Sequence, residues 1–259
     1  MTIRRNYRPP DGVPQWILIS QVEHARLSGE LARHWGAFPF APLVPCPEVT
    51  DAIAHHDDGW AQWERGPGID AETGRPLAFT EMPAEVGLPI WTVSIERALA
   101  LGNLAAWMIA GHFSSLLEGS TTAKSETGRR WLAKYRDCRA GWLRHWMTEE
   151  PAAHTPRVAE RALGHLQFFD AISLWLCCAE QVQPATMTPP GGPSLMLTPG
   201  ADTTAGEQII RVAPWPLAIP SLTLSVPGRA IPAKRYGSTA ELLAAAADVR
   251  IGWRVVGDG

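Results

Sequence analysis

Four positions in this chain combine the side chains that bind divalent metal ions. They are His24, the adjacent pair His56 and Asp57, and the distant Asp170. Imidazole nitrogen together with carboxylate oxygen suits borderline ions such as Mn, Fe, Co, Ni or Zn, which activate water and polarise substrate oxygens. Burying these groups is costly unless they are paired, and one cation would offset that cost for all of them. The sequence therefore predicts a metal site formed by these four residues.

His24 belongs to a predicted helix near the amino end. Ser20 is followed three residues later by Glu23, the spacing of a capping box, so a helix should begin there and continue to about residue 35. The helical repeat places His24 on the same face as Leu27, Leu31 and Trp35. His24 is thus expected to face the core.

The doublet of His56 and Asp57 lies at the end of a second predicted helix. Four prolines between residues 36 and 47 cannot continue a helix interior and mark a connection. Helical patterning resumes near Glu48, and Gly59 ends it. This helix should deliver the doublet at its carboxyl end.

Three more helices are expected farther along the chain. On the segment from 156 to 181, Asp170 interrupts an otherwise apolar face, and a carboxylate there needs a partner. The pattern over residues 92–118 places His112 on an inward side. An aromatic stripe over residues 125–149 predicts a helix that packs along the core.

These residues resemble a known superfamily. The order of a histidine, a His-Asp pair and a distant aspartate on helices is similar to that of HD-domain metal-dependent enzymes. More narrowly, the segments QVEHARLSGELARHWG, AIAHHDDGW, AGHFSSLL and FFDAISLWLC resemble an uncharacterised bacterial family, a domain of unknown function with the HDDGW signature. The likeness covers most of residues 15–180 and extends weakly to the carboxyl end. It implies that His24, His56, Asp57 and Asp170 are the metal ligands.

The same resemblance raises the question of a second ion. HD proteins that hold two metals have two further histidines between the doublet and the last aspartate. His112 fits one of these places, as a metal ligand or a general acid. For the other the chain offers His145, His154 or His165, and none has a matching context. The sequence therefore leaves open whether the site binds one ion or two.

Asp57 and three further residues are assigned to catalysis or substrate binding. Asp57 is expected to act in catalysis as well as to bind metal. Asp58 either orients a ligating imidazole or faces solvent. Trp60 follows the doublet and is expected beside a pocket. Arg75 would hold an anionic substrate through its planar fork, unless it is an ordinary surface arginine.

The expected fold is mainly α, with an HD-like helical bundle as its core. This metal-binding domain covers residues 1–183 and contains a long loop, 64–89, of the kind that forms lids or binding walls. Turn clusters and runs such as LTLSV and GWRVV predict a small β-rich appendage over 184–259, with a short helix at 238–248. The strand WILIS, residues 16–20, would pair with this appendage, which we expect to pack on the core and not to fold independently.

Composition narrows the range of partners. The 259 residues are 46% hydrophobic and 19% charged, which is typical of a globular protein. A formal charge of -3 and a pI near 6.2 argue against nucleic acid, since that partner needs clustered Lys and Arg. A small-molecule substrate is expected, and a homo-oligomer is compatible with the composition.

Cysteine usage and hydropathy indicate the compartment. Cys46, Cys138, Cys177 and Cys178 show no zinc-finger spacing, and free thiols favour a reducing environment. The amino end has no signal-peptide core, and no stretch of 18 uncharged apolar residues occurs. The sequence therefore predicts a cytoplasmic protein without a membrane partner.

Three functions are consistent with this site. The first is a metal-dependent hydrolase of HD type that acts on a small phosphate ester; a polyphosphate substrate is disfavoured because strong basic clusters are missing. The second is an HD-type di-iron oxygenase that cleaves a small substrate with O₂ in an aromatic, water-shielded pocket. The third is a metal-binding or sensing module without catalysis.

Overall fold

The structure is a computed structural model that describes residues 2–9, 12–178, 183–202 and 207–258. Six longer α-helices and a short one occur in this described part: α1 Gln21–Arg33, α2 Cys46–His55, α3 Ala84–Ala98, α4 Asn103–Glu118, α5 Glu126–Glu149, α6 Pro156–Cys178 and α7 Thr239–Ala244. Short 3-10 turns connect some of them: η1 Asp58–Ala61, η2 Trp63–Arg65, η3 Phe79–Glu81 and η4 Thr121–Lys124.

A single curled sheet collects strands from both ends of the chain. The strands are β1 Thr2–Tyr7, β2 Gln15–Ser20, β3 Ala185–Met187, β4 Leu195–Asp202, β5 Gln208–Ala213, β6 Ser221–Pro232 and β7 Ala247–Gly257. Their order in the sheet is β1-β2-β6-β7-β5-β4-β3. Neighbours are antiparallel except β5 and β7, which are parallel. The predicted pairing of the WILIS strand with the carboxyl-terminal part is confirmed, because β2 pairs with β6.

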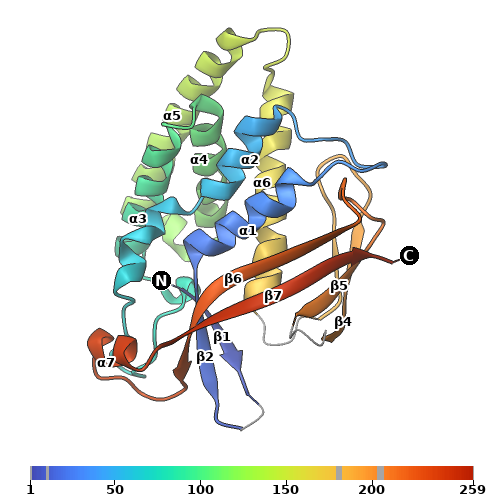
Figure 1. Ribbon diagram of the computed structural model, residues 1–259. Helices are drawn as coiled ribbons and strands as arrows, with labels where there is room; N and C mark the ends of the chain where they lie inside the picture. The colour runs from blue at the N-terminus through green and yellow to red at the C-terminus, as the bar shows by residue number, and fades with distance from the viewer. Residues whose placement is uncertain (1, 10–11, 179–182, 203–206, 259) are drawn as a thin grey trace.

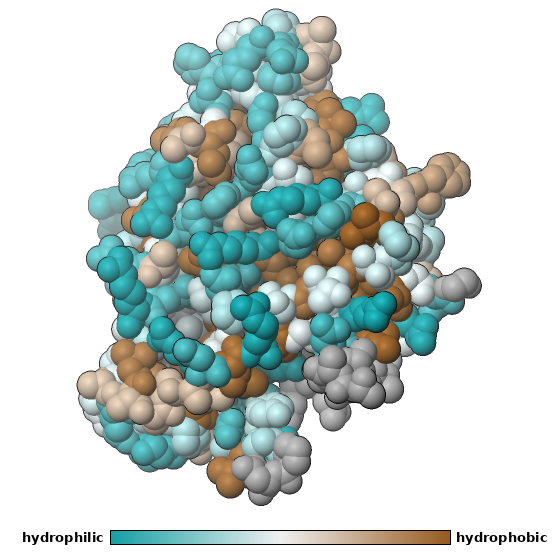
Figure 2. Space-filling model, viewed as in Figure 1, coloured by the Kyte–Doolittle hydropathy of each residue, from teal (hydrophilic) through white to brown (hydrophobic). Residues whose placement is uncertain are grey.

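The helices and the sheet form two layers (Figure 1). Helices α1 and α6 lie between the sheet and the remaining helices, since α1 contacts β6 on one side and α2 on the other. Apolar residues of α1 and α6, such as Leu31 and Ile172, meet Leu197, Ile210 and Val255 of the sheet. On the viewed surface, hydrophilic side chains cover much of the face and apolar residues form small groups (Figure 2).

The predicted fold class was wrong. The structure is 49% helix and 22% strand, and its seven-stranded mixed sheet forms a half-barrel, so it is not plainly a helical bundle with a small appendage. The sheet was underestimated because its pairings join residues far apart in the chain, such as Leu18 with Arg229. Alternation of buried and exposed residues along one strand, as in β6, does not show which strands will pair. The division of the chain at residue 183 stays a prediction, and strands from both sides of it share the one sheet.

Several element boundaries also differ from prediction. The helix expected over 92–118 is two helices, because Gly102 adopts φ 125° between α3 and α4 and interrupts the helical path. Helix α3 begins at Ala84, within the predicted loop 64–89, and tolerates Pro89. The helix expected over 156–181 is described to Cys178, and its predicted end at 179–181 lies outside the described residues.

The turn after the doublet is pressed against α3. A Cβ added at Gly59 would lie 2.2 Å from the carbonyl oxygen of Ile90, so only glycine fits there. The Gly59 N–H donates to Ser94 Oγ at 2.9 Å, and Arg97 donates to the carbonyl oxygen of Asp58 at 2.5 Å. Helix α3 therefore fixes the segment that directly follows the doublet. None of the described helices is both long and apolar enough to span a membrane.

Candidate metal centre

Four elements bring five ionisable side chains together. His24 lies on α1, His56 and Asp57 follow directly after α2, His112 lies on α4 and Asp170 on α6. The three imidazoles and Asp57 are buried, and the side chain of Asp170 is 13% exposed. Two overlapping groups have donor atoms within 4.8 Å of one another, one of His24, His56 and Asp57 and one of His56, His112 and Asp170. Each group is suited to hold a metal ion.

Hydrogen bonds to serines decide which nitrogen of His24 faces this group. Nδ1 of His24 lies 2.8 Å from Ser173 Oγ, and Ser173 donates its own proton to the carbonyl oxygen of Asp170 at 2.9 Å. Ser28 Oγ is 2.8 Å from Ser173 Oγ. Ser173 therefore accepts from Nδ1–H, which leaves Nε2 of His24 as an acceptor. That acceptor lies 3.0 Å from Oδ2 of Asp57, another acceptor.

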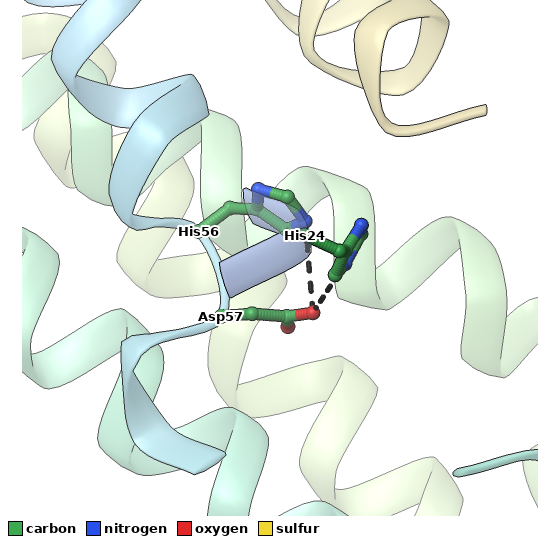
Figure 3. A group of neighbouring side chains, drawn as sticks. All are labelled: His24, His56 and Asp57. Carbon is green, nitrogen blue, oxygen red and sulfur yellow. Dashed lines mark hydrogen bonds and ion pairs between the residues drawn. The ribbon is translucent and has the colours of Figure 1, made fainter. Parts of the chain in front are cut away.

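His56 is oriented in the same way by the backbone. Its Nδ1 lies 2.8 Å from the carbonyl oxygen of Ile53, which only accepts, so Nδ1 carries the proton. Nε2 of His56 is buried without a hydrogen-bond partner. It is 3.3 Å from Oδ1 of Asp170 and 3.7 Å from Oδ2 of Asp57. Figure 3 shows the side chains of His24, His56 and Asp57 converging. Acceptors that face one another at these distances require a proton or a metal cation between them.

The spacing of the donor atoms fits an ion. Neighbouring ligands at about 2.1 Å from a metal lie about 3.0–3.4 Å apart. The His24 to Asp57 and His56 to Asp170 distances are 3.0 and 3.3 Å, while His24 Nε2 lies 3.7 Å from Asp170 Oδ1. His112 Nε2 is 3.8 Å from Oδ2 of Asp170. The group is therefore nearly arranged for coordination, with His112 at its edge.

Protonation couples the members of the group. Burial lowers the pKa of His56, but the charges of Asp57 and Asp170 outweigh it and raise that pKa to about 9. Burial raises the pKa of Asp170, yet the imidazoles of His56, His112 and His24 hold it well below its usual range. Burial lowers the pKa of His112. Without a metal, a proton on His56 neutralises part of the carboxylate charge, and a metal ion would replace it.

Of the other predicted site residues, one lies at the metal centre and two lie away from it. Trp60 lies at the centre, since its Nε1 donates to Oδ1 of Asp57 at 3.0 Å. Asp58 instead pairs with Nδ1 of His55 at 2.9 Å, so it orients a histidine outside the candidate ligand set. Arg75 is exposed and lines a separate surface groove with Trp16. The structure thus places Trp60 at the site and Asp58 and Arg75 away from it.

None of the three alternatives for a second histidine joins a candidate group among the described residues. His154 stacks on Trp146 with ring centroids 3.9 Å apart, and its Nδ1 contacts the carbonyl oxygen of Trp146. His165 is buried, and burial together with the charge of Arg161 lowers its pKa to about 4. His145 is exposed. These side chains serve packing or the surface.

A cavity of about 260 Å³ opens beside the centre. His24, Asp57, His112 and Asp170 line it, and among the described lining residues no Lys or Arg occurs. Much of its wall is apolar, with side chains that include Trp60, Phe79, Leu88, Trp91, Phe113 and Leu174. Residues 79–88 supply one wall, so the predicted loop region does help to form the cavity. Exposed Thr80, Leu116 and Ser120 mark its mouth.

Two functional residues were missed by sequence reasoning. Gln21 lines the cavity, and Ser28 contacts the hydroxyl that orients His24. A helical signal for both was present, because they lie three residues before and four residues after His24 and share its face. Polar residues on a helix are common without a function, so this spacing alone does not single them out.

Comparison with known proteins assigns no activity. Residues 11–233 match a family described as a protein of unknown function, DUF3891. No curated protein matches, and no solved structure matches.

Proposed function

We propose that this chain, which belongs to the DUF3891 family, is a metal-dependent hydrolase of HD type that acts on a small ester, with phosphate monoesters as the first class to test. The observation that carries the proposal is the acceptor arrangement at the centre. Nε2 of His24 and Nε2 of His56 both face carboxylate oxygens, and Nε2 of His56 is buried without a hydrogen-bond partner. A divalent cation would satisfy these atoms together.

One ion accounts for the charge of the centre. Asp57 and Asp170 contribute two negative charges, and neutral imidazoles contribute none, so a single divalent ion balances the ligands. A second ion would have to share His56 and Asp170 with the first, since among the described residues the second group adds only His112 to them. We therefore assign His24, His56, Asp57 and Asp170 to one ion. His112, at the edge of the group, is left for proton transfer.

Each residue then has a chemical role. When bound, the ion would lower the pKa of a water molecule to near neutrality and polarise the ester oxygen. Asp57 is held in place by the N–H of Trp60. In hydrolysis a water oxygen bonds to phosphorus and gives up a proton, the bond from phosphorus to the leaving oxygen breaks, and that oxygen takes up a proton. His112 lines the cavity and can do both transfers, because a neutral imidazole can take the proton from the water and then donate it to the leaving oxygen.

The doublet provides a matched experiment. The double variant His56→Ala with Asp57→Ala should lose bound metal, whereas His55→Ala with Asp58→Ala removes the same residue types beside it and should keep it. Elemental analysis of the purified full chain measures the metal, and hydrolysis of p-nitrophenyl phosphate with Mn²⁺ measures the activity. Equal metal content in both variants would contradict the metal site. Metal without hydrolysis would contradict the hydrolase and favour a sensing module.

The cavity wall favours a second candidate, an oxygenase of the di-iron HD type. The aromatic rings of Trp60, Phe79 and Trp91 would shield an oxidising intermediate from water, and among the described lining residues no Lys or Arg is present to bind phosphate oxygens. Iron content decides between the two. If anaerobically purified protein contains two irons per chain and consumes O₂ with a substrate, hydrolysis is excluded; iron-free protein that hydrolyses esters with Mn²⁺ excludes oxygenation.

A further inference from the structure

A buried polar side chain on the cavity wall has no partner. Gln21 is 2% exposed and lines the cavity beside the metal centre. Its Oε1 is buried and accepts no hydrogen bond. Buried amide oxygens are usually paired, because leaving one unpaired costs free energy. Oε1 itself has almost no accessible surface, so the amide must turn toward the cavity before an entering N–H or O–H can remove this cost.

Gln21 is also held rigidly. It is the first residue of α1, capped by Ser20, and its backbone N–H donates to Oε1 of Glu64 at 2.5 Å. Ser20 Oγ contacts the same carboxylate. Gln21 lies about one helical turn before His24 and therefore projects from the same face of α1. The helix that carries a metal ligand therefore places this residue at the cavity.

The rest of the wall defines what such a ligand is. Aromatic and aliphatic side chains, among them Trp91, Phe113 and Leu174, form most of it, and the only ionisable groups among the described lining residues belong to the metal centre. The volume of about 260 Å³ is below the range typical of sites for drug-sized ligands. The cavity therefore suits a small molecule whose body is apolar and uncharged.

We propose that Gln21 recognises the substrate by accepting a hydrogen bond from a neutral hydroxyl or amino group on a small, otherwise apolar organic body. This inference rests on the proposed function only in that the cavity is the substrate site. The proposed role of Gln21 restricts the substrates to a narrower class than small esters in general. The organic part should be aromatic or aliphatic with one neutral donor, and the reacting group should lie at the metal.

The test uses two probes of equal shape that differ in one donor. Benzyl alcohol and ethylbenzene differ by a hydroxyl in place of a methyl group, and Trp60 and Trp91 report on cavity binding through fluorescence. Binding to the metal-loaded full chain is compared for wild type, for Gln21→Met, and for the exposed control Gln62→Met. We expect the preference for benzyl alcohol over ethylbenzene to fall about tenfold in Gln21→Met and to be unchanged in Gln62→Met. An unchanged preference in Gln21→Met would overturn the proposal.

Stability separates recognition from a structural role. If Gln21 serves binding, Gln21→Met should unfold at the same temperature as wild type or higher, since it removes an unpaired buried amide. A clear fall in unfolding temperature would mean that the amide supports the fold and would overturn the proposal. Gln21→Leu is a second apolar variant in case Gln21→Met does not fold. The probe titration is repeated after the metal has been removed with a chelator. A protein that binds no metal or hydrolyses no ester can still show the Gln21-dependent preference, so failure of the proposed hydrolase and failure of the Gln21 proposal give different results.

Discussion

Helices α1 and α6 each serve two regions of opposite character. At one region His24 and Asp170 form a polar group beside a cavity. At the other, Leu31 and Ile172 pack against the sheet in a region lined by apolar residues. Burial of apolar surface stabilises the second region, whereas burial of charged and polar groups costs free energy in the first unless a cation binds. The packing of the helices on the sheet therefore supplies the folding stability that holds the metal centre in place.

The largest expected effect tests the polar region. Asp170→Asn should lower bound metal at least tenfold, because it removes a negative ligand whose pKa is held well below its usual range. Glu160→Gln, an exposed change on the same helix, should leave the metal content as it is. Elemental analysis measures both variants. The comparison would break if Asp170→Asn abolished folding itself, because the polar region would then be needed for stability.

The next effect tests the apolar region. Leu197 on β4 is 3% exposed and faces α1 and α6, so Leu197→Ala should lower the free energy of unfolding by about 2–5 kcal/mol. Denaturant unfolding gives this value, and the metal content of the folded fraction should stay at that of wild type. Met196→Ala on the same strand is a control, since Met196 is 57% exposed. A loss of metal in Leu197→Ala would show that the two regions are not separable.

A smaller effect is expected from the serine that orients His24. Ser173→Ala removes the acceptor for Nδ1–H and should weaken metal binding about tenfold without lowering the capacity for one ion. Metal titration against a competing chelator measures the affinity. Ser115→Ala is the control, because that hydroxyl only contacts the carbonyl oxygen of Gly111 and Gln167. Equal affinity in wild type and Ser173→Ala would show that the position of His24 is set by packing alone.

The smallest effect is a pH dependence outside the centre. The pKa of His165 is about 4 in the folded chain and near 6.5 when exposed, so the unfolded state binds a proton first as the pH falls. Stability should therefore decrease between pH 7 and pH 5 by about 1–2 kcal/mol through this group. His165→Gln should flatten this part of the unfolding curve. The same slope in both proteins would assign the pH dependence to other groups.

Local patterns were sufficient for the positions of the main ligands. The helical repeat around His24 and the interruption of an apolar face by Asp170 both arise within a few turns of one helix. Loop 64–89 was harder, because Gly87 and Pro89 are poor helix formers, yet α3 begins at Ala84. Packing of α3 against the turn at Gly59 outweighs that local preference. The groove that Arg75 lines was not predictable for a similar reason, since no local pattern indicates which groove a loop residue will line, and its substrate-binding role stays a prediction.

Short-range periodicity specifies most of the helices and the inward side of His24, His112 and Asp170, because it is a property of neighbouring residues. Tertiary contacts specify the rest: strands from both ends form one sheet, His112 joins the centre while His145, His154 and His165 do not, and Oε1 of Gln21 is buried without a partner beside the cavity. Each of these depends on contacts between residues far apart in the chain, and such contacts are chosen by the packing of whole elements.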